Sequence, residues 1–440
     1  MTETAGGNSI GGAPGAEGAA SRPVKGSRVG IVGGSIAGCA LAIALSRLGC
    51  AVTVLERSST GLRDRGSGIA IPKPLRDELI DDGYLPSDYP TWLASSRGWH
   101  LADGTDSGTQ IWAQPGTATM NNWGSLWRGL RDNLPDDVEY LDGCQVLSVD
   151  DLAVDRGAAG AVVVGLGDGT SMDFDVVFGA DGYRSLVRST VQPDTAPNFA
   201  GYVLWRGNFP AEELTDRAAW DEVCATGQWV TVAFDGGHAV MYPIPDFDAA
   251  EHGGLRVNWA IYAPKPDALA LTGPSSIPPG QVDDACYSEF VALLDATMPP
   301  KFRPLFDTPQ EQLSIQPVYD EAVDQYTSGR LAVIGDAATL SRPHTGSGAT
   351  KAMEDARLIE ALGADHQDWR SLLAAYDEDR SEVGKRLVAL GRRIGRAQVE
   401  RTPPWAKMTH SDFEAWASGT LGDDELYFWS ADDEAAPATA

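Results

Sequence analysis

The sequence has few cysteines and histidines for its length, and none of them stands in a metal-binding pattern. Its five cysteines are widely spaced and form no C-x-x-C motif, and its six histidines include no H-E-x-x-H motif. An odd number of scattered cysteines argues against a disulfide framework and suits the reducing cytoplasm. We therefore predict a cytoplasmic protein that needs no metal ion, in which Cys39 and Cys50 are small packing residues.

Positive charge is also scarce. The chain carries 34 lysine and arginine residues against 62 aspartate and glutamate residues, which gives a formal net charge of −28. No basic stripe is available to neutralise phosphates, so the composition argues against a nucleic-acid partner and against an anionic membrane surface. No run of about 20 apolar residues occurs, so no membrane-spanning helix is predicted.

The two ends of the chain lack the features of folded segments. The first 27 residues are rich in glycine, alanine and serine and contain no 7–15-residue apolar stretch of the kind found in a signal peptide. We predict disordered segments at residues 1–27 and 431–440. The 440-residue length exceeds the roughly 250–300 residues that one core supports, so two joined domains are expected.

Three short motifs carry most of the functional information, and the first is a strand, glycine turn, helix and strand. Residues 28–32 and 51–55 are typical of buried parallel strands, and residues 36–48 of a helix. Residues 33–38 fit G-x-G-x-x-G with Ser35 in the second glycine position, a pattern that brings a pyrophosphate to a helix N-terminus. Glu56 follows Gly38 by 18 residues, near the offset of about 20 expected for a ribose-binding acid. A βαβ unit that binds nothing is the structural alternative.

The other two motifs each contain an aspartate next to a glycine. Asp181 and Gly182 lie in GADGYRSLVR, and Asp336 lies in LAVIGDAATLSRPHTGSGA. A carboxylate suits a sugar site because it accepts two hydroxyl hydrogen bonds at once. The three motifs in this order predict a chain that wraps around an FAD.

Between the second and third motifs the helical periodicity fades. Strands are predicted at 202–209, 228–234, 238–244 and 255–262, with a hairpin turn at 235–237. Further strands are predicted at 145–149, 160–166, 171–174 and 175–179, and helices at 348–362 and 369–399. The pattern predicts a mainly antiparallel sheet inserted into an α/β domain.

The motifs resemble those of the group A FAD-dependent aromatic monooxygenases, the para-hydroxybenzoate hydroxylase class. The string RPHTG at 342–346 is similar to the 2,6-dihydroxypyridine hydroxylase-like branch, and the resemblance covers about residues 28–401. It implies an α/β fold, with a Rossmann-type (GR2-like) FAD-binding domain at residues 28–75, 116–200 and 317–368. It also implies a mainly antiparallel β-sheet substrate domain at 76–115 and 201–316 and a C-terminal helical region at 369–430.

The resemblance implies roles for individual residues. Glu56 would bind the adenosine ribose, Val146 the adenine through its backbone, and Asp336 the ribityl chain. Arg128 would lie on the phosphate-bearing side of the cofactor, although an exposed helix arginine is the alternative. Asp181 and Gly182 would serve both the pyrophosphate and the nicotinamide partner, and the helix start at 346–349 would face the flavin pyrimidine edge. The implied FAD-binding residues are Gly33, Ser35, Ile36, Ala37, Gly38, Glu56, Arg57, Arg128, Val146, Asp181, Gly182, Asp336, Pro343, Gly346, Ser347, Gly348 and Ala349.

The implied chemistry uses non-covalent FAD, NADPH or NADH, O₂ and a small aromatic substrate. The nicotinamide would reduce the flavin, and O₂ would add to give a C4a-hydroperoxide that passes one oxygen to an electron-rich ring. A flavin-dependent reductase or dehydrogenase, Baeyer–Villiger oxygenation and a non-catalytic FAD-binding protein are the alternatives, and the Asp181 motif argues against the last. The sequence does not choose between a monomer and a homodimer.

Three residues are candidates for handling the substrate. His344 has an ordinary pKa near about 6.5, so it could hold or take a phenolic proton at neutral pH, or it could merely pack its loop. Arg206 could hold an anionic substrate or the flavin ring, or be a surface strand residue. Tyr242 could line the roof of the pocket, or be a core tyrosine with a satisfied hydroxyl.

Overall fold

The structure is a computed structural model that describes residues 22–60, 62, 67–152, 161–246, 254–271, 273, 275–421 and 426. The predicted disordered segments at 1–21 and 431–440 lie outside the described residues. Residues 22–27 were predicted to belong to the disordered extension, and that part of the prediction is wrong. Val24 is 3% exposed within the first core, and Pro23 forms a β-bridge with Asp368.

The first of three sheets is parallel in all strands but one. Its order is β16-β17-β10-β1-β2-β6. Strands buried on both faces need continuous apolar side chains, which explains runs such as RVGIV and VVFG. The strands are β1 (Arg28–Val32), β2 (Ala51–Glu56), β6 (Glu139–Asp142), β10 (Val176–Gly179), β17 (Leu331–Val333) and the antiparallel β16 (Thr327–Ser328).

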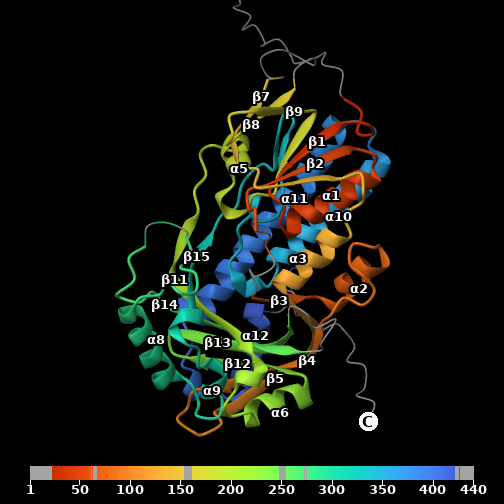
Figure 1. The fold of residues 1–440 in the computed structure, drawn as a ribbon. Helices are drawn as coiled ribbons and strands as arrows, with labels where there is room; N and C mark the ends of the chain where they lie inside the picture. The colour runs from red at the N-terminus through yellow and green to blue at the C-terminus, as the bar shows by residue number, and fades with distance from the viewer. Residues whose placement is uncertain are drawn as a thin grey trace, which may run out of the picture.

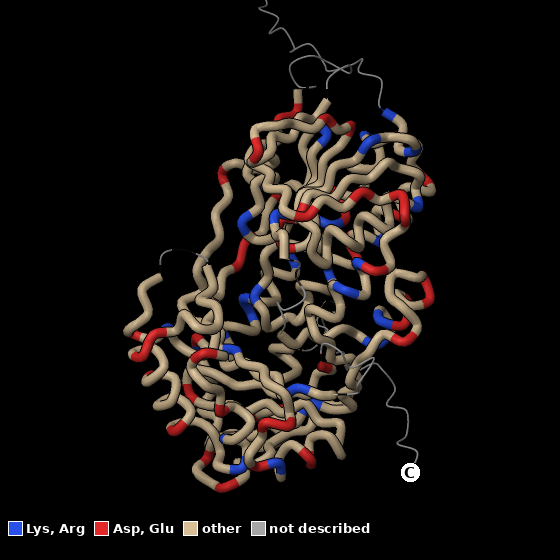
Figure 2. Tube along the Cα trace, viewed as in Figure 1, with Lys and Arg blue, Asp and Glu red and all other residues tan. Residues whose placement is uncertain are grey.

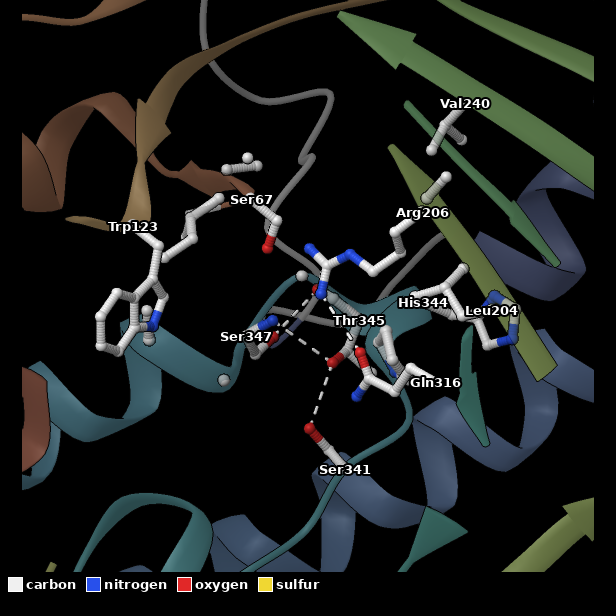
Figure 3. A pocket seen from close by; sticks show the side chains of 18 of the residues that line it. Ser67, Trp123, Leu204, Arg206, Val240, Gln316, Ser341, His344, Thr345 and Ser347 are labelled. Atoms are coloured by element: carbon white, nitrogen blue, oxygen red, sulfur yellow. Dashed lines mark hydrogen bonds between the residues drawn. The ribbon is translucent and has the colours of Figure 1, made fainter. Parts of the chain in front are cut away.

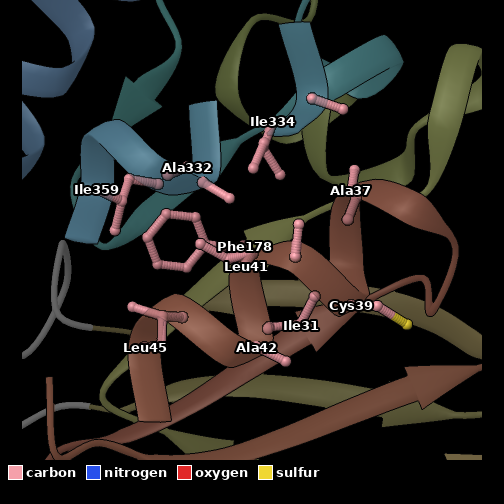
Figure 4. Close-up of a cluster of buried hydrophobic side chains, with 14 of the residues drawn as sticks. Ile31, Ala37, Cys39, Leu41, Ala42, Leu45, Phe178, Ala332, Ile334 and Ile359 are labelled. Carbon is pink, nitrogen blue, oxygen red and sulfur yellow. The ribbon is translucent and has the colours of Figure 1, made fainter. Parts of the chain in front are cut away.

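Helices cover one face of this sheet and a small second sheet covers the other. Helix α1 (Ile36–Arg47) packs with α10 (Gly348–Asp365), and Figure 4 shows Leu41 and Leu45 of α1 beside Phe178 of β10. On the other face lie β7 (Val146–Asp151), β8 (Val162–Leu166) and β9 (Ser171–Phe174), which form an antiparallel sheet. The ring of Phe174 fills the space beside Gly30, where a Cβ atom would be 2.8 Å from it.

The third sheet has eight strands and forms the second lobe (Figure 1). Its order is β15-β11-β14-β13-β12-β4-β5-β3, and the described pairs are antiparallel except β12 with β4. Its strands are β3 (Gly68–Ile71), β4 (Trp92–Leu101), β5 (Thr109–Asn122), β11 (Asn198–Pro210), β12 (Gln228–Phe234), β13 (Gly237–Pro245), β14 (Leu255–Pro264) and β15 (Ser314–Asp320).

The sheet corrects the predicted domain boundaries. Residues 68–71, 116–122, 198–200 and 317–320 were assigned to the FAD-binding domain, but they belong to strands of the eight-stranded sheet. Strands β4 and β5 were not predicted, because their apolar and polar residues do not alternate regularly and two register shifts interrupt their pairing. The inserted sheet itself is confirmed, together with its hairpin turn at Gly236, where φ is +82°.

The two faces of this sheet have different functions, and strand periodicity separates them. On β11, β13 and β14, odd-numbered residues such as Trp205, Met241 and Trp259 enter a core with the insert helices α6 (Ala218–Thr226), α8 (Asp284–Thr297) and α9 (Arg303–Phe306). Even-numbered residues such as Arg206 and Tyr242 face the other way, toward the first lobe. Successive side chains alternate between faces in any strand, so one strand supplies both layers.

The remaining α-helices complete the described part of the fold. They are α2 (Lys73–Asp81), α3 (Trp123–Asp132), α5 (Leu186–Val191), α11 (Trp369–Gly395) and α12 (His410–Leu421). The helix predicted at 369–399 changes at Gly395 into a π-helical turn, η7 (Arg396–Glu400). Figure 1 shows α10 and α11 between the two large sheets, and Figure 2 shows acidic residues over both lobes. Among the described residues, no helix combines the length and the apolarity that crossing a membrane requires.

A buried carboxylate fixes the turn that carries the third motif. Asp355 on α10 is fully buried and accepts hydrogen bonds from the backbone N–H of Gly335 at 2.9 Å, from Lys351 at 2.6 Å and from Arg380 at 2.6 Å. Lys351 is 2% exposed and Arg380 is 7% exposed, so the negative charge of Asp355 is paired with two buried positive charges. The conformation of residues 335–337 therefore depends on Asp355.

We predict that Asp355→Asn lowers the free energy of unfolding of the FAD-free protein by about 3–5 kcal/mol, because it leaves two buried cations without their carboxylate. Urea unfolding followed by fluorescence would measure this. The matched control is Glu354→Gln, whose side chain is 42% exposed and 3.5 Å from Arg380, and which should cost less than about 1 kcal/mol. Equal losses in the two variants would contradict the role of Asp355.

Candidate active site

The three motifs meet at the N-terminus of α1. Gly33 has φ +100°, and a Cβ atom there would lie 2.5 Å from the carbonyl oxygen of Ala180, just before Asp181. Gly335 has φ +60° and packs against Ala37 of α1 and Ala352 of α10, with its added Cβ at 3.1 and 3.3 Å from theirs. Only glycine permits both the positive φ and the close approach. The first motif thus contacts the second through Gly33 and the third through Gly335.

Glu56 holds the glycine turn from the side. Its two carboxylate oxygens accept the backbone N–H groups of Gly34 and Ser58, each at 2.8 Å, and the side chain is 6% exposed. Trp127 and Tyr140 donate to the carbonyl oxygen of Gly34 at 2.9 and 2.8 Å. Each carboxylate oxygen keeps a second lone pair, so the predicted bond to a ribose is compatible with these contacts.

The residues predicted for the adenosine end lie apart from the main cavity. Arg57 is exposed at the end of β2, Arg128 is half-buried on α3, and Val146 is half-buried at the start of β7. The backbone N–H of Cys144 donates to the carbonyl of Glu56 at 2.8 Å, which brings the start of β7 toward Glu56. Their roles toward an adenosine remain predictions.

One cavity joins the N-termini of α1 and α10 to the cavity face of the eight-stranded sheet. Its volume is about 360 Å³. Thirteen of the residues predicted for the site line it, namely Ser35, Ile36, Ala37, Gly182, Arg206, Tyr242, Asp336, Pro343, His344, Gly346, Ser347, Gly348 and Ala349. Figure 3 shows Arg206 reaching from its strand toward the loop that carries Thr345 and Ser347. The structure therefore brings the third motif and the substrate candidates into one site.

The motif end of the cavity has unpaired groups of the kinds that FAD requires. No hydrogen bond from a described residue reaches the carboxylate of Asp336, which is exposed and lines the cavity. The buried Oδ1 atom of Asp181 also has no partner among the described residues, while its Oδ2 atom accepts from the backbone N–H of Leu186 at 2.7 Å. No side chain caps the N-termini of α1 and α10, so their first N–H groups are available to anionic or polar ligand atoms. These groups fit FAD. The two carboxylates can accept hydrogen bonds from sugar hydroxyls, and the two helix N-termini can bind a phosphate and one edge of the flavin.

The sheet end of the cavity is cationic and aromatic. Arg206 donates to Gln316 at 3.2 Å, while its Nε atom is buried and has no partner among the described residues. Arg97 donates to Thr231 at 2.8 Å and stacks on Trp99 and Trp229, with 4.3 and 5.0 Å between its guanidinium carbon and the ring centroids. Among the lining residues that the structure describes, Asp336 is the only acid.

Tyr242 lies beside Arg206 in this wall. Burial raises the pKa of Tyr242 to about 12, and its ring contacts that of Trp229 at 4.8 Å between centroids. Asn258 hydrogen-bonds Tyr242 and accepts from the backbone N–H of Gly68 at 2.6 Å. Tyr242 is therefore a protonated phenol on the cavity wall.

His344 is enclosed by other rings. It stacks on Tyr262 at 4.1 Å between centroids, and Tyr262 stacks in turn on His238 at 4.5 Å. Its Nε2 atom is 2.7 Å from the hydroxyl of Tyr202, and its Nδ1 atom is buried without a partner among the described residues. Burial, together with the charges of His238, Arg342 and Arg97, lowers the pKa of His344 well below its usual value. The imidazole is neutral at pH 7.

Several lining residues were missed by the sequence reasoning, although a signal for them existed. Arg97, His238, Asn258, Tyr262 and Gln316 all line the cavity. On β13 the cavity residues are His238, Val240 and Tyr242, and on β14 they are Asn258, Ala260 and Tyr262. Polar and aromatic residues at every second position mark the face that does not enter the apolar core.

Comparisons with known proteins agree with this geometry. The family described as FAD binding domain matches residues 289–390, and the family described as pyridine nucleotide-disulphide oxidoreductase matches residues 28–84. A 2,6-dihydroxypyridine 3-monooxygenase from Paenarthrobacter nicotinovorans is 28% identical over 81% of this chain and 88% of its own. A 3-amino-4-hydroxybenzoate 2-monooxygenase from Streptomyces platensis is 28% identical over 80% and 83%.

The fold is shared with a solved structure. That of 2,6-dihydroxypyridine-3-hydroxylase from Arthrobacter nicotinovorans has a TM-score of 0.74 and 24% identity, over 87% of this chain and 95% of that one. In sequence and fold the chain is similar to the group A flavoprotein monooxygenases. Its cofactor is FAD, and NAD(P)H is the co-substrate of this class.

We predict that Asp336→Ala and Glu56→Ala both weaken FAD binding, and that their effects on the FAD-free protein differ. Glu56 bonds two backbone N–H groups, so its loss should destabilise the apoprotein by about 1–3 kcal/mol. Asp336 makes no such bond, so its loss should lower stability only when FAD is present, by mass action. Thermal unfolding with and without FAD and an FAD titration would measure both effects.

Asp324→Ala, at an exposed aspartate, is the control for that comparison. If both variants kept the wild-type affinity for FAD, the assigned ribityl and ribose contacts would be wrong.

Proposed function

We propose that the chain uses NAD(P)H and O₂ to hydroxylate a small, electron-rich aromatic or heteroaromatic compound that carries an anionic oxygen. One observation carries the proposal. A single cavity connects the FAD-binding motifs to a wall that holds Arg206, Arg97 and His344. Two relatives support it, because their names give a dihydroxypyridine and an amino-hydroxybenzoate as substrates, and both compounds are electron-rich rings with oxygen substituents.

The bound FAD would accept reducing equivalents from NAD(P)H and activate O₂, and the protein would position the ring that receives the oxygen. Arg206 extends its guanidinium group into the cavity (Figure 3), and Gln316 accepts a hydrogen bond from its Nη1 atom at 3.2 Å. Tyr242 offers a hydroxyl, and His344 offers the nitrogen that the protein leaves without a partner. Trp229 and Tyr262 supply flat apolar surfaces that exclude water from one side of the site.

Two other chemistries remain to be separated from hydroxylation. A reductase or dehydrogenase on the same scaffold would oxidise NAD(P)H without adding oxygen to the substrate, and Baeyer–Villiger oxygenation would insert oxygen beside a carbonyl. Mass spectrometry of products from 2,6-dihydroxypyridine, 3-amino-4-hydroxybenzoate and a panel of phenols and quinols would decide. We expect a product that is heavier by one oxygen, with ¹⁸O from ¹⁸O₂. NAD(P)H oxidation that is stimulated by a substrate and leaves that substrate unchanged would contradict the proposal.

The location and assembly of the protein are also proposed. Five free cysteines, three of them buried, support a reducing cytoplasmic location. A homodimer is proposed as the assembly, and sedimentation of the FAD-bound protein would test it.

We predict that Arg206→Gln raises KM for an anionic substrate roughly 10- to 100-fold and lowers the yield of product per NAD(P)H, because it removes a charge-assisted hydrogen bond worth about 1.5–3 kcal/mol. FAD affinity should not change. Steady-state kinetics with a carboxylate substrate and its amide analogue would measure the effect, and the amide should be much less affected. Arg217→Gln on the insert surface, paired with Asp221, is the charge-matched control. An equal rise in KM for the acid and the amide would contradict a role in binding charge.

A further inference from the structure

The hydrogen bonds around Tyr202 determine which nitrogen of His344 carries the proton. Tyr202 lies on β11 and is 2% exposed. Its hydroxyl oxygen has two partners among the described residues, namely Nε2 of His344 at 2.7 Å and the guanidinium Nη1 of Arg342 at 3.3 Å. Each of these hydrogen bonds has one donor and one acceptor, and this requirement determines where the protons of Tyr202 and His344 lie.

Arg342 can only donate. Its guanidinium group has five N–H donors and no acceptor, so its contact with Tyr202 uses a lone pair of the phenol oxygen. The phenol proton of Tyr202 then has one acceptor available, which is Nε2 of His344. The other arrangement, with Nε2–H donating to Tyr202, would leave the buried phenol proton without a partner. A buried unsatisfied donor is costly, so this arrangement is disfavoured.

We propose that Tyr202 holds His344 as the Nδ1–H tautomer, so that His344 donates a hydrogen bond to an anionic oxygen of the substrate and does not accept a proton from it. This inference rests on the proposed function for the identity of the ligand. In neutral imidazole one nitrogen donates and the other accepts. With Nε2 occupied by the phenol proton, the donor is Nδ1, a buried atom that has no partner among the described residues. His344 lines the cavity, where an oxygen of the substrate can supply that partner.

Burial and, after it, the surrounding positive charges keep the imidazole neutral. Arg342 on the same loop, Arg97 on β4 and His238 on β13 face His344, and the other rings against it are the neutral Tyr202 on β11 and Tyr262 on β14. An imidazolium would be repelled by the two guanidinium groups, whereas an anionic oxygen would be attracted by them. The site is therefore suited to bind a substrate that is already an anion.

Arg342 is itself held in place from two sides. It donates to Asp320 at 2.7 Å and to Glu400 on the π-helical turn at 2.5 Å. Gly395, the last residue of α11, leaves the space in which these groups meet. A Cβ atom there would lie 2.3 Å from the hydroxyl of Tyr202, 2.7 Å from Arg342 Nη1 and 3.3 Å from the ring of His344. Tyr202, Arg342 and Gly395 are thus positioning residues for His344.

The first test reads the tautomer directly. In the FAD-reconstituted protein, ¹⁵N NMR of labelled histidine side chains should show His344 with a protonated Nδ1 and an unprotonated Nε2, with the signal assigned by its loss in His344→Gln. Tyr202→Phe should convert it to a mixture of tautomers. Tyr262→Phe, which keeps the stacked ring and removes a hydroxyl that has no part in this network, should leave the tautomer unchanged. A protonated Nε2 in the wild-type protein would overturn the proposal, whether or not the protein hydroxylates any compound.

The second test separates a donor from a base. An asparagine places its amide near the position of Nδ1, and a glutamine places its amide near Nε2, but neither can accept a proton from a phenol. His344→Asn should therefore retain roughly 10- to 100-fold more product per NAD(P)H consumed than His344→Gln, with 2,6-dihydroxypyridine as the probe. Equal loss in both variants would support a general base and contradict the donor role. Absence of hydroxylation in the wild-type protein would instead contradict the proposed function, and the NMR result would still decide the tautomer.

Discussion

The whole site depends on how closely three backbone turns approach one another. The glycine turn after β1, the segment that begins at Ala180 and the turn at residues 335–337 come from distant parts of the chain, and at Gly33 and Gly335 an added methyl group would meet backbone or alanine carbons at 2.5–3.3 Å. This close contact places two helix N-termini and the carboxylate of Asp336 along one end of the cavity, with Asp181 next to the lining residue Gly182. A larger residue at either glycine would move the sugar-binding acids away from the phosphate-binding turn.

The contact needs support that the cofactor motifs do not provide. Asp355 accepts a hydrogen bond from the backbone N–H of Gly335 and is paired with Lys351 and Arg380. Side chains of α10 and α11 therefore hold the third motif in place. Glu56 does the same for the glycine turn through the N–H groups of Gly34 and Ser58. In both cases a carboxylate binds backbone donors that a loop would otherwise expose. Both turns are therefore fixed by hydrogen bonds within the protein, which reduces the ordering cost of binding FAD.

The sequence predicted the part of the molecule in which local pattern determines structure. Strand β1 and helix α1 follow from apolar runs and a glycine turn, Glu56 was proposed from its spacing to them, and Asp336 was proposed from its own motif and the family resemblance. The boundaries between domains could not be predicted, because β3 joins the eight-stranded sheet only by pairing with β5. In that pair Gly68 lies opposite Asn122, which is 54 residues away in the sequence. The change from α-helix to a π-helical turn after Gly395 was also missed. Long-range contacts leave no local periodicity.

The chemistry of His344 also depends on long-range contacts that the sequence does not reveal. From sequence its ordinary pKa made a general base the natural hypothesis. In the fold the ring is buried between Tyr202, Tyr262 and His238, and two guanidinium groups oppose its protonation. The acidic surface of a chain with net charge −28 coexists with a cavity whose sheet end holds only cationic and neutral groups among the described residues. Inside a low-dielectric cavity nearby charges act more strongly than the distant acids of the surface, which solvent screens. Burial and, after it, the local cations therefore keep His344 neutral, and the same cations support the proposed anionic ligand, so neither property can be read from the overall charge of the chain.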